Sequence, residues 1–325
     1  MDFAGQTVLV TGIAGFVGAN LARELRARGA NVHGLERATA YMWRLGELLP
    51  NIDLHRTDLT DAPALEQALR AIKPSIVYHL ATQRAARTPQ ERAATMRSNV
   101  LGTLNLLEAA ASAGCERFIH VGSSLEYGPK DQPSREADLL APRSFFGACK
   151  AAGSLLCRQF ALEHRLPLVI LRLYSVYGYW EGPERLIPTA ILAALGNGSI
   201  ALTAAPCSRD FVFALDVVEA CLLAADANAD PGEIFNVGTG QQWTNEQAIA
   251  MVESIAGRKL SRRAEAYPAR PTDTTFWVAD NDKARRILQW SPRHSLRDGL
   301  AKTWAWMVQH RDQYETIARA IPTHT

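Results

Sequence analysis

The stretch that decides the fold is TVLVTGIAGFVGANLARELRARG, residues 7–29. Residues 7–11 form an apolar, β-branched run typical of a buried strand, and residues 19–28 have helical periodicity that ends before Gly29. Between them, glycines recur at Gly12, Gly15 and Gly18. A glycine-spaced turn between a strand and a helix lets the backbone approach a pyrophosphate, and the helix N-terminus offers free N–H groups to that anion. The stretch therefore predicts a dinucleotide site.

The glycine-spaced stretch could also be an ordinary tight turn, and the segment that follows favours a dinucleotide site instead. A second strand, residues 31–35, leads to Glu36, an acid that can hydrogen-bond both ribose hydroxyls of an adenine dinucleotide. Glu36 would also repel a 2′-phosphate, which favours NAD over NADP. Arg37 weakens that preference, because a guanidinium could pair with the same phosphate.

The composition is that of an ordinary soluble globular protein, with 325 residues, 47% hydrophobic, 21% charged and a net charge of +2. With this charge balance, we expect neither a strongly positive surface that would bind nucleic acid nor a polybasic stretch that would bind a membrane. The N-terminus lacks a signal-peptide pattern, and no apolar run approaches the length of a membrane span. The cysteines are odd in number and lack metal spacing, so we expect reduced thiols, no metal and a cytoplasmic location; they are Cys115, Cys149, Cys157, Cys207 and Cys221.

Strand and helix signals alternate through the first half of the chain. We expect strands at 52–55, 75–80, 117–121 and 168–173, and helices at 62–72, 91–113 and 146–164. This alternation predicts an α/β fold, a Rossmann-like doubly wound parallel sheet with a smaller, interleaved C-terminal substrate lobe. After Gly178 the pattern loosens into a helix at 183–195 and a strand at 199–203, and a strand at 234–237 is expected to return to the main sheet. The dinucleotide domain is predicted at 1–178 plus about 204–240, and the substrate lobe at 179–203 and about 241–325.

The TGIAGFVG motif near the start of a chain of this length resembles the extended short-chain dehydrogenase/reductase family. Its members are nucleotide-sugar epimerases, dehydratases and ketoreductases, and the resemblance extends to about Met307. It implies that NAD is held at the turn by Gly12, Gly15, Phe16, Val17 and Gly18. Further cofactor contacts are implied at Glu36, Arg37, Asp58, Leu59, Leu80, Ala81, Lys150, Tyr174 and Val176.

Some of these residues have simpler explanations. Asp58 would accept a hydrogen bond from the adenine amino group, although it could instead be an acid that stabilises a turn. Asp61 is better placed than Asp58 to cap the next helix. His79 is best explained as a satisfied core histidine. Asn99 matches a residue that helps to organise the active site, but it is equally explained as a polar residue within a helix.

An arginine-rich stretch follows the fourth strand. Arg84, Arg87, Arg92 and Arg97 have only Glu91 against them, and such a run is usually a solvated face. A weaker interpretation is that part of it lines the mouth of a site for an anionic ligand.

The fifth strand leads into GSSLEYG. By the resemblance, Ser123 would hydrogen-bond the sugar hydroxyl that is oxidised, and Ser124 would contact the substrate. Dehydratases of the family carry an Asp-Glu pair directly after that position, where this chain has Ser124 and Leu125. Dehydration needs an acid and a base, so this activity is disfavoured. Glu126 and Tyr127 are expected to pack under the loop.

The sequence departs from the family pattern in PRSFFGACK. The family has a proton-transferring Tyr and a Lys with three residues between them, and here these positions are Phe146 and Lys150. The two positions share a helix face, but phenylalanine cannot transfer a proton. Three explanations stay open: a deliberate Tyr→Phe change, another group such as Tyr127, Cys149 or Ser123, or loss of the redox step.

On the substrate side, three arginines resemble a diphosphate clamp, because guanidinium forks bind phosphate oxygens bidentately. They are Arg185, Arg209 and Arg270. The predicted activity is modification of a nucleotide-diphosphate sugar through transient C4 oxidation, with an NAD-dependent 4-epimerase first. The alternatives are an NADPH-dependent 4-keto-6-deoxy-sugar reductase and a protein that binds nucleotide sugar and NAD without redox turnover.

The resemblance also implies a homodimer through the helices predicted at 91–113 and 146–164. Their apolar stripes would meet about a two-fold axis. The stripe residues are Leu101, Leu104, Leu107, Leu155 and Leu156.

Overall fold

Seven parallel strands form the central sheet of the computed structural model, which describes residues 2–84, 86–196, 198–203, 207–267 and 273–320. Their order in space is β11-β6-β5-β4-β1-β2-β3. The bounds are β1 Thr7–Thr11, β2 Asn31–Glu36, β3 Asp53–Arg56, β4 Ile76–His79, β5 Arg117–Ser123, β6 Leu168–Leu173 and β11 Glu233–Val237. The order reverses between β1 and β4, which is the topological switch point where such sheets bind ligands. The predicted doubly wound sheet, including the late return of β11, is confirmed.

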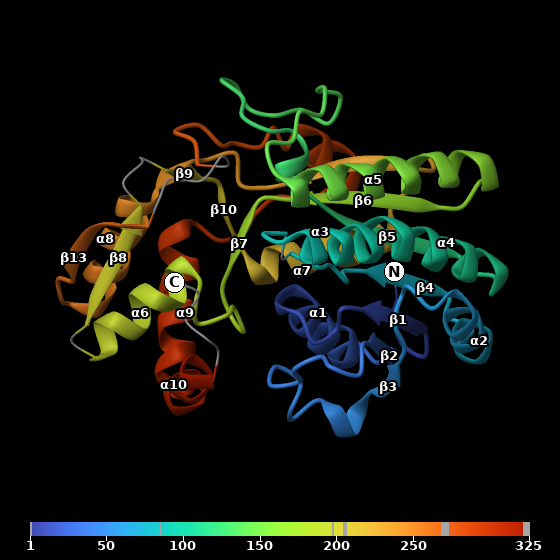
Figure 1. Ribbon diagram of the computed structural model, residues 1–325, viewed down its shortest axis with the longest axis horizontal. Helices are drawn as coiled ribbons and strands as arrows, with labels where there is room; N and C mark the ends of the chain where they lie inside the picture. Colours follow the sequence, from blue (N-terminus) through green and yellow to red (C-terminus); the bar gives the residue numbers. More distant parts are fainter. Residues whose placement is uncertain (1, 85, 197, 204–206, 268–272, 321–325) are drawn as a thin grey trace.

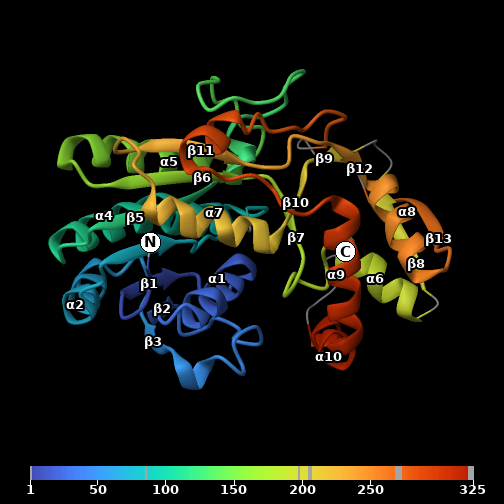
Figure 2. The ribbon, with the colours of Figure 1, turned by 180° about the vertical axis from the view of Figure 1, so that it is seen from behind.

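Helices cover both faces of this sheet. On one face lie α2 (Ala62–Ile72), α4 (Gly102–Ser112) and α5 (Phe145–His164), and α4 and α5 are nearest the viewer in Figure 1. On the other face lie α1 (Phe16–Ala27) and α7 (Ala214–Asp226), and α7 is nearest the viewer in Figure 2. Each face buries its own apolar cluster. The helix bounds match the prediction for 62–72, whereas α1 begins three residues earlier than predicted.

The long helix predicted at 91–113 is interrupted. The structure has α3 (Pro89–Met96), a π-helical turn over Arg97–Leu101, and then α4. The buried Asn99 lies in this turn. π-Helical turns within α-helices are frequent at functional sites.

A smaller lobe lies beside the carboxyl ends of the strands (Figure 1). It contains α6 (Leu186–Gly196), β8 (Ser199–Thr203), α8 (Asn245–Ala256), β13 (Ser261–Tyr267), α9 (Leu296–Gln309) and α10 (Arg311–Ala320). Two small sheets connect it to the main sheet. They pair β7 (Ser175–Tyr177) with β10 (Phe211–Phe213) and β9 (Ser208–Arg209) with β12 (Trp243–Thr244).

The loop after β7 joins the two parts. Its residue Trp180 has a φ of +66°, a conformation that bulky side chains rarely adopt. Three successive carbonyl groups of this loop accept hydrogen bonds from side chains of three different segments. The bonds are Asn20 to Tyr179 (2.8 Å), Arg44 to Trp180 (2.7 Å) and Tyr314 to Glu181 (2.8 Å). The loop is therefore fixed against both parts at once.

The apolar stripes that the dimer prediction used are only partly exposed. Leu101 and Leu155 are exposed, but Leu107 is fully buried in the core, so its assignment to the stripe was wrong. Leu104 and Leu156 are half-buried. The exposed set also includes Met96 and Leu162. The homodimer stays a prediction.

Within the described residues, no helix has both the length and the apolar character that a membrane crossing requires. All five cysteines are buried and unpaired.

Candidate active site

The glycine turn after β1 excludes side chains by its geometry. Gly12 has a φ of +70°, and a Cβ there would lie 2.6 Å from the Ala81 nitrogen. A Cβ on Gly18 would overlap the carbonyl oxygen of Gly12. Helix α1 begins at Phe16 with Gly15 as its N-cap, so the first N–H groups lack partners within the helix. This cradle fits the phosphates of a dinucleotide.

Glu36 ends β2 next to this cradle. One of its carboxylate oxygens accepts a hydrogen bond from the Ala14 N–H at 2.8 Å. Burial raises the pKa of Glu36, while the Ala14 hydrogen bond and the charge of Arg37 oppose this rise. Arg37 in turn donates to Gln83 at 3.4 Å. The contacts of Glu36 and Arg37 with the adenosine ribose stay predictions.

Asp58 and Leu59 follow β3. One carboxylate oxygen of Asp58 accepts from both the backbone N–H and the hydroxyl of Thr60, each at 2.8 Å. Asp61 caps α2 by accepting from Ala64, as predicted. Leu59 is buried, and its carbonyl accepts from Asn105. Asp58 thus has the local turn role, and its adenine contact stays a prediction.

The end of β4 contacts the glycine turn. The N–H of Leu80 donates to the Thr11 carbonyl, and that of Ala81 to the Thr11 hydroxyl. His79 is fully buried between hydroxyl groups of Thr11 (2.8 Å) and Thr103 (2.9 Å). Burial lowers the pKa of His79 to about 3, so it stays neutral. The prediction of a satisfied core histidine is confirmed.

Asn99 holds the segment beyond Ala81. Its side-chain oxygen accepts from the Gln83 N–H at 2.8 Å, and its amide nitrogen donates to the Gln83 carbonyl at 2.9 Å. Thr82 donates to the same oxygen at 3.3 Å. Asn99 is therefore a positioning residue for the chain beside the site, which is more than a polar residue within a helix.

A buried polar network supports the loop after β5. Ser123 accepts from the Leu125 N–H, and its own N–H donates to Glu126 at 2.8 Å. Glu126 forms a buried ion pair with Arg172 at 2.8 Å. Burial raises the pKa of Glu126, and the charge of Arg172 opposes this rise. The hydroxyl of Tyr127 donates to Asn236 at 2.7 Å. Glu126 and Tyr127 pack under the loop, as predicted.

Ser124 has a partner that the sequence did not indicate. Its hydroxyl accepts from the indole N–H of Trp277 at 3.0 Å, and both residues are buried. Trp277 packs with Tyr174, Ala279 and Leu125. Its place shortly after Arg270 was the one available signal.

Helix α5 brings position 146 and Lys150 to the end of β5. Ser144 caps the helix by accepting from Gly147 at 3.0 Å. Lys150 is buried, and its ammonium donates to the carbonyl of Val121 at 2.5 Å. Burial lowers the pKa of Lys150, and Glu126 opposes this change. Phe146 is half-buried. The predicted group of Ser123, Phe146 and Lys150 is therefore assembled from β5 and α5.

Two further cofactor candidates follow β6. The N–H of Tyr174 donates to the Val237 carbonyl, and Val176 lies opposite Val212 in the β7–β10 pair. Tyr174 is buried, whereas Val176 is half-buried. The backbone of both is thus fixed beside the end of the sheet.

Two of the three arginines of the predicted diphosphate clamp form ion pairs within the chain, and the clamp stays a prediction. Arg209 is half-buried and pairs with Asp273 at 3.2 Å, a partner that the sequence analysis left out. Arg185 is exposed and lies 3.6 Å from Glu181. Arg270 lies outside the described residues. Burial raises the pKa of Glu181 from 4.5 to about 7, and the charge of Arg185 opposes this rise.

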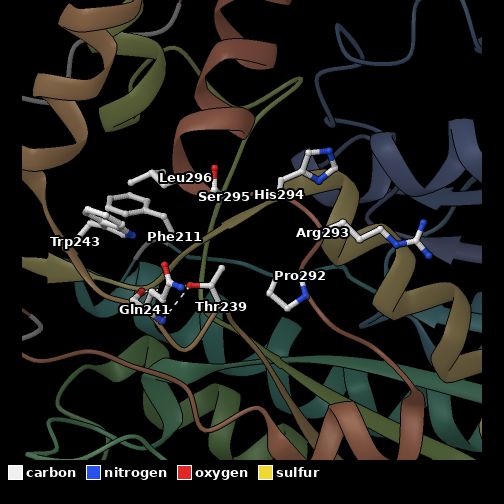
Figure 3. Close-up of a pocket in the computed structure, with 9 residues that line it drawn as sticks. All are labelled: Phe211, Thr239, Gln241, Trp243, Pro292, Arg293, His294, Ser295 and Leu296. Carbon is white, nitrogen blue, oxygen red and sulfur yellow. Dashed lines mark hydrogen bonds between the residues drawn. The ribbon is translucent and has the colours of Figure 1, made fainter.

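Two hollows lie away from the predicted site. One, of about 220 Å³, is walled by the aromatic rings of Phe211 and Trp243 and by the segment before α9 (Figure 3). The other, of about 370 Å³, is lined by Tyr41, Trp43 and residues of α10. None of the predicted site residues lines either hollow.

The arrangement can perform chemistry of one kind. A cradle for phosphates follows β1 at the switch point of the parallel sheet, and a serine hydroxyl and a lysine ammonium belong to the end of β5 and to α5, two strands away. This order of groups suits a dinucleotide and a hydroxyl-bearing substrate. Within the described ranges, no group of three His, Cys, Asp or Glu side chains is placed so that it could hold a metal ion.

Comparisons with known proteins agree with this geometry. A family model described as "NAD dependent epimerase/dehydratase family" matches residues 8–238. The chain is 31% identical to the UDP-glucose 4-epimerase of Rhizobium meliloti (strain 1021), over 92% of this chain and 96% of that protein.

Two solved structures are similar over almost the whole chain. The UDP-glucose 4-epimerase of Thermotoga maritima with UDP-glucose has a TM-score of 0.85 and 27% identity, covering 94% of this chain and 99% of that chain. A Tyr-to-Phe mutant of the UDP-glucuronic acid 4-epimerase from Bacillus cereus was solved with UDP-4-deoxy-4-fluoro-glucuronic acid and NAD. It has a TM-score of 0.84 and 29% identity, covering 93% and 99% of the two chains.

Proposed function

This chain belongs to the NAD dependent epimerase/dehydratase family, and we propose that it binds NAD and a nucleotide-diphosphate sugar whose C4 is transiently oxidised. A 4-epimerase is the first candidate. The observation that carries the proposal is the buried Lys150, whose ammonium donates to the carbonyl of Val121, two residues before Ser123 at the end of β5. The 4-epimerase relatives support the sugar class.

The residues at this end of the sheet have separate roles. Bound NAD supplies the hydride acceptor. Gly12, Gly15 and the first turn of α1 hold its phosphates, and Glu36 holds its adenosine ribose. Ser123 hydrogen-bonds the C4 hydroxyl of the sugar, and the Lys150 ammonium stabilises negative charge that develops beside it. In an epimerase, the C4 carbinol would lose a hydride to NAD and its hydroxyl proton to a base, and both would return, with the hydride arriving on the opposite face of C4.

Phe146 favours a second candidate function. A phenyl ring cannot accept the proton that leaves the C4 hydroxyl, and a positioned acid or base contributes about 10²–10⁴-fold to such a rate. A protein that binds nucleotide sugar and NAD without turnover therefore stays open. An NADPH-dependent reductase would require that the attraction of Arg37 for the 2′-phosphate of NADPH exceed the repulsion of that phosphate by Glu36. Dehydratases also occur among the relatives, but Ser124 and Leu125 provide no acid–base pair.

Identification of the bound dinucleotide tests the cofactor proposal. The purified protein is denatured, and the released nucleotide is separated by reversed-phase chromatography. We expect NAD or NADH, and we expect titration of the emptied protein to give tighter binding of NAD than of NADP. Glu36→Gln should reduce that preference by about tenfold, because it removes the carboxylate charge.

A matched control is Glu24→Gln, which changes an exposed acid of α1 that pairs with Arg28. It should leave the preference unchanged. Tighter binding of NADP by the unmodified protein would contradict the role given to Glu36 and favour the reductase.

A further inference from the structure

A tryptophan from a distant part of the chain lies against two loops of the candidate site. The indole N–H of Trp277 donates to the hydroxyl of Ser124, in the loop after β5, at 3.0 Å. The indole ring packs with Leu125 of the same loop and with Tyr174, which directly follows β6. Ser124 and Tyr174 are predicted to contact the substrate and the cofactor. Trp277 therefore bridges the two segments where the sugar and the nicotinamide are expected.

The backbone that carries Trp277 is held by contacts to other segments. Its N–H donates to the side chain of Gln242 at 3.1 Å. Two residues later, the N–H of Ala279 donates to the buried carboxylate of Asp210 at 3.1 Å. Ala279 also pairs with Ser134 in an isolated β-bridge. The indole is therefore carried by an anchored segment.

The loop that carries Ser124 is anchored as well. The Ser123 hydroxyl accepts from the Leu125 N–H at 3.2 Å, and the buried Glu126 accepts from the Ser123 N–H at 2.8 Å. Ser124 is 5% exposed and Trp277 is 7% exposed. Because bulk water does not reach the bond between them, its direction is set by the two side chains and their neighbours.

The chemistry of the two groups orients the Ser124 hydroxyl. An indole N–H can only donate, whereas a hydroxyl has one proton to donate and two lone pairs that accept. Since Trp277 donates to the oxygen of Ser124, the Ser124 proton must point away from the indole. In the part of the chain that the structure describes, this proton has no acceptor, although buried polar groups are normally hydrogen-bonded. Ser124 therefore presents a hydrogen-bond donor to a ligand.

Sugar chemistry relates this donor to a substrate. In the proposed function Ser123 faces the C4 hydroxyl, and Ser124 is the next residue. A hexose carries acceptor oxygens on C3, which is bonded to C4, and on C6, which is two bonds from C4. We infer that Trp277 is a positioning residue, which aims the Ser124 proton at one of these oxygens, and that the site selects a sugar that carries this oxygen over the corresponding deoxy sugar. This inference rests on the proposed function.

Binding to the NAD-loaded protein tests the inference without requiring turnover. Calorimetric titrations with UDP and UDP-glucose separate the affinity for the nucleotide from the gain that the sugar provides. Trp277→Phe keeps an aromatic ring and removes the N–H. We expect it to weaken UDP-glucose by about threefold to tenfold, the range of a neutral hydrogen bond, and to leave the affinity for UDP within about twofold.

A double-mutant cycle shows whether Trp277 acts through Ser124. Ser124→Ala should weaken UDP-glucose by a similar factor, and adding Trp277→Phe to it should cause no further loss, because the indole then has no hydroxyl to orient. Ser124→Thr keeps a hydroxyl and should restore part of the affinity.

A second buried tryptophan provides the matched control. The indole N–H of Trp290 donates to the carbonyl of Asp216 in α7 at 2.8 Å. Trp290→Phe removes an equivalent buried hydrogen bond, so it should lower the melting temperature and leave the affinities for UDP and UDP-glucose unchanged. Melting temperatures also verify that each Trp277 and Ser124 variant is folded.

Deoxy analogues identify the oxygen that accepts the Ser124 proton. UDP-3-deoxyglucose and UDP-6-deoxyglucose each lack one of the two candidates. One of them should bind the unmodified protein about threefold to tenfold more weakly than UDP-glucose. That difference should disappear in Ser124→Ala and shrink in Trp277→Phe.

The outcomes separate the inference from the proposed function. Four results would each overturn the inference alone: an unchanged affinity for UDP-glucose in Trp277→Phe, an equal loss of affinity for UDP, additive losses in the double variant, or full affinity for both deoxy analogues. The same comparison applies on dTDP or GDP if one of these nucleotides binds in place of UDP. If the glucose derivative of none of the three nucleotides binds to the unmodified protein, the proposed function fails and the inference fails with it.

Discussion

Replacement of Phe146 by tyrosine restores one oxygen at the centre of the candidate site. Position 146 and Lys150 lie one turn apart on α5, so their side chains emerge about 6 Å from each other. At that separation, and with an effective dielectric constant of about 20, a phenolate and an ammonium attract each other by about 3 kcal/mol. This energy increases the ionised fraction of the phenol about a hundredfold.

We therefore expect Phe146→Tyr to raise the turnover of a nucleotide sugar by about 10²–10⁴-fold, equivalent to about 2.7–5.4 kcal/mol of transition-state stabilisation. The assay follows conversion of UDP-glucose and UDP-glucuronic acid into their C4 epimers by chromatography, with NAD present. Substrate affinity should change little, because the phosphate-binding residues are untouched.

Two controls show whether the gain comes from the position of the hydroxyl. Phe145→Tyr adds the same group one residue earlier, about 100° around the helix, and should have no effect. Adding Lys150→Met to Phe146→Tyr should remove most of the gain. The reasoning is refuted if the unmodified chain is already fast and Phe146→Tyr does not change its rate.

Two other predictions concern stability and assembly. Because burial raises the pKa of Glu181 from 4.5 to about 7, the contribution of Glu181 to the free energy of unfolding should be largest below pH 4.5 and fall by about 3 kcal/mol as the pH rises through about 7. Glu181→Gln should abolish this fall in urea denaturation at pH 5 and 8, and the exposed neighbour Glu184→Gln should keep it. For the dimer, we expect Leu155→Glu on α5 to give a monomer in light scattering. The control Leu139→Glu introduces the same charge at an exposed leucine of a loop and should leave the dimer intact. A monomer of the unmodified protein at micromolar concentration would count against the dimer.

The parallel sheet was predictable because its signals are local. The strand at 168–173 and the helix at 62–72 have the observed bounds, since a continuous apolar run and an Asp61 cap are each visible within a few residues. The start of α1 was misplaced by three residues because Phe16 and Val17 follow a glycine and lack polar neighbours that mark a helix face. The break in the long helix at Asn99 has no propensity signal, because a π-helical turn is stabilised by the contacts that it makes.

The site was predictable as a set of positions but not as a set of contacts. Ser123 and Lys150 were predicted from the family resemblance of short motifs and stay predictions, whereas Trp277 reaches Ser124 from a segment far along the chain. The ion pair of Arg209 with Asp273 likewise joins two residues that are far apart in the sequence. Such pairs depend on how the small lobe packs against the sheet, and no periodicity in the sequence records that packing.

The contacts around Phe146 also narrow the explanations for the missing hydroxyl. Tyr127 is fully buried and its hydroxyl is committed to Asn236, so it cannot reach a substrate. Burial raises the pKa of the Cys149 thiol, which disfavours the thiolate that a base requires. Ser123 is then the one candidate of the three that stays open, but a serine hydroxyl needs a base of its own.

The contacts on either side of position 146, which we call its frame, are present: the Ser144 cap of α5 and the hydrogen bond from Lys150 to Val121. A site that had decayed with its function would have no reason to keep a buried lysine, whose desolvation costs stability unless the charge is used. If position 146 is that of the family's tyrosine, this maintained frame favours a single Tyr→Phe replacement over general loss of the site, and this is why we expect one substitution to restore the rate.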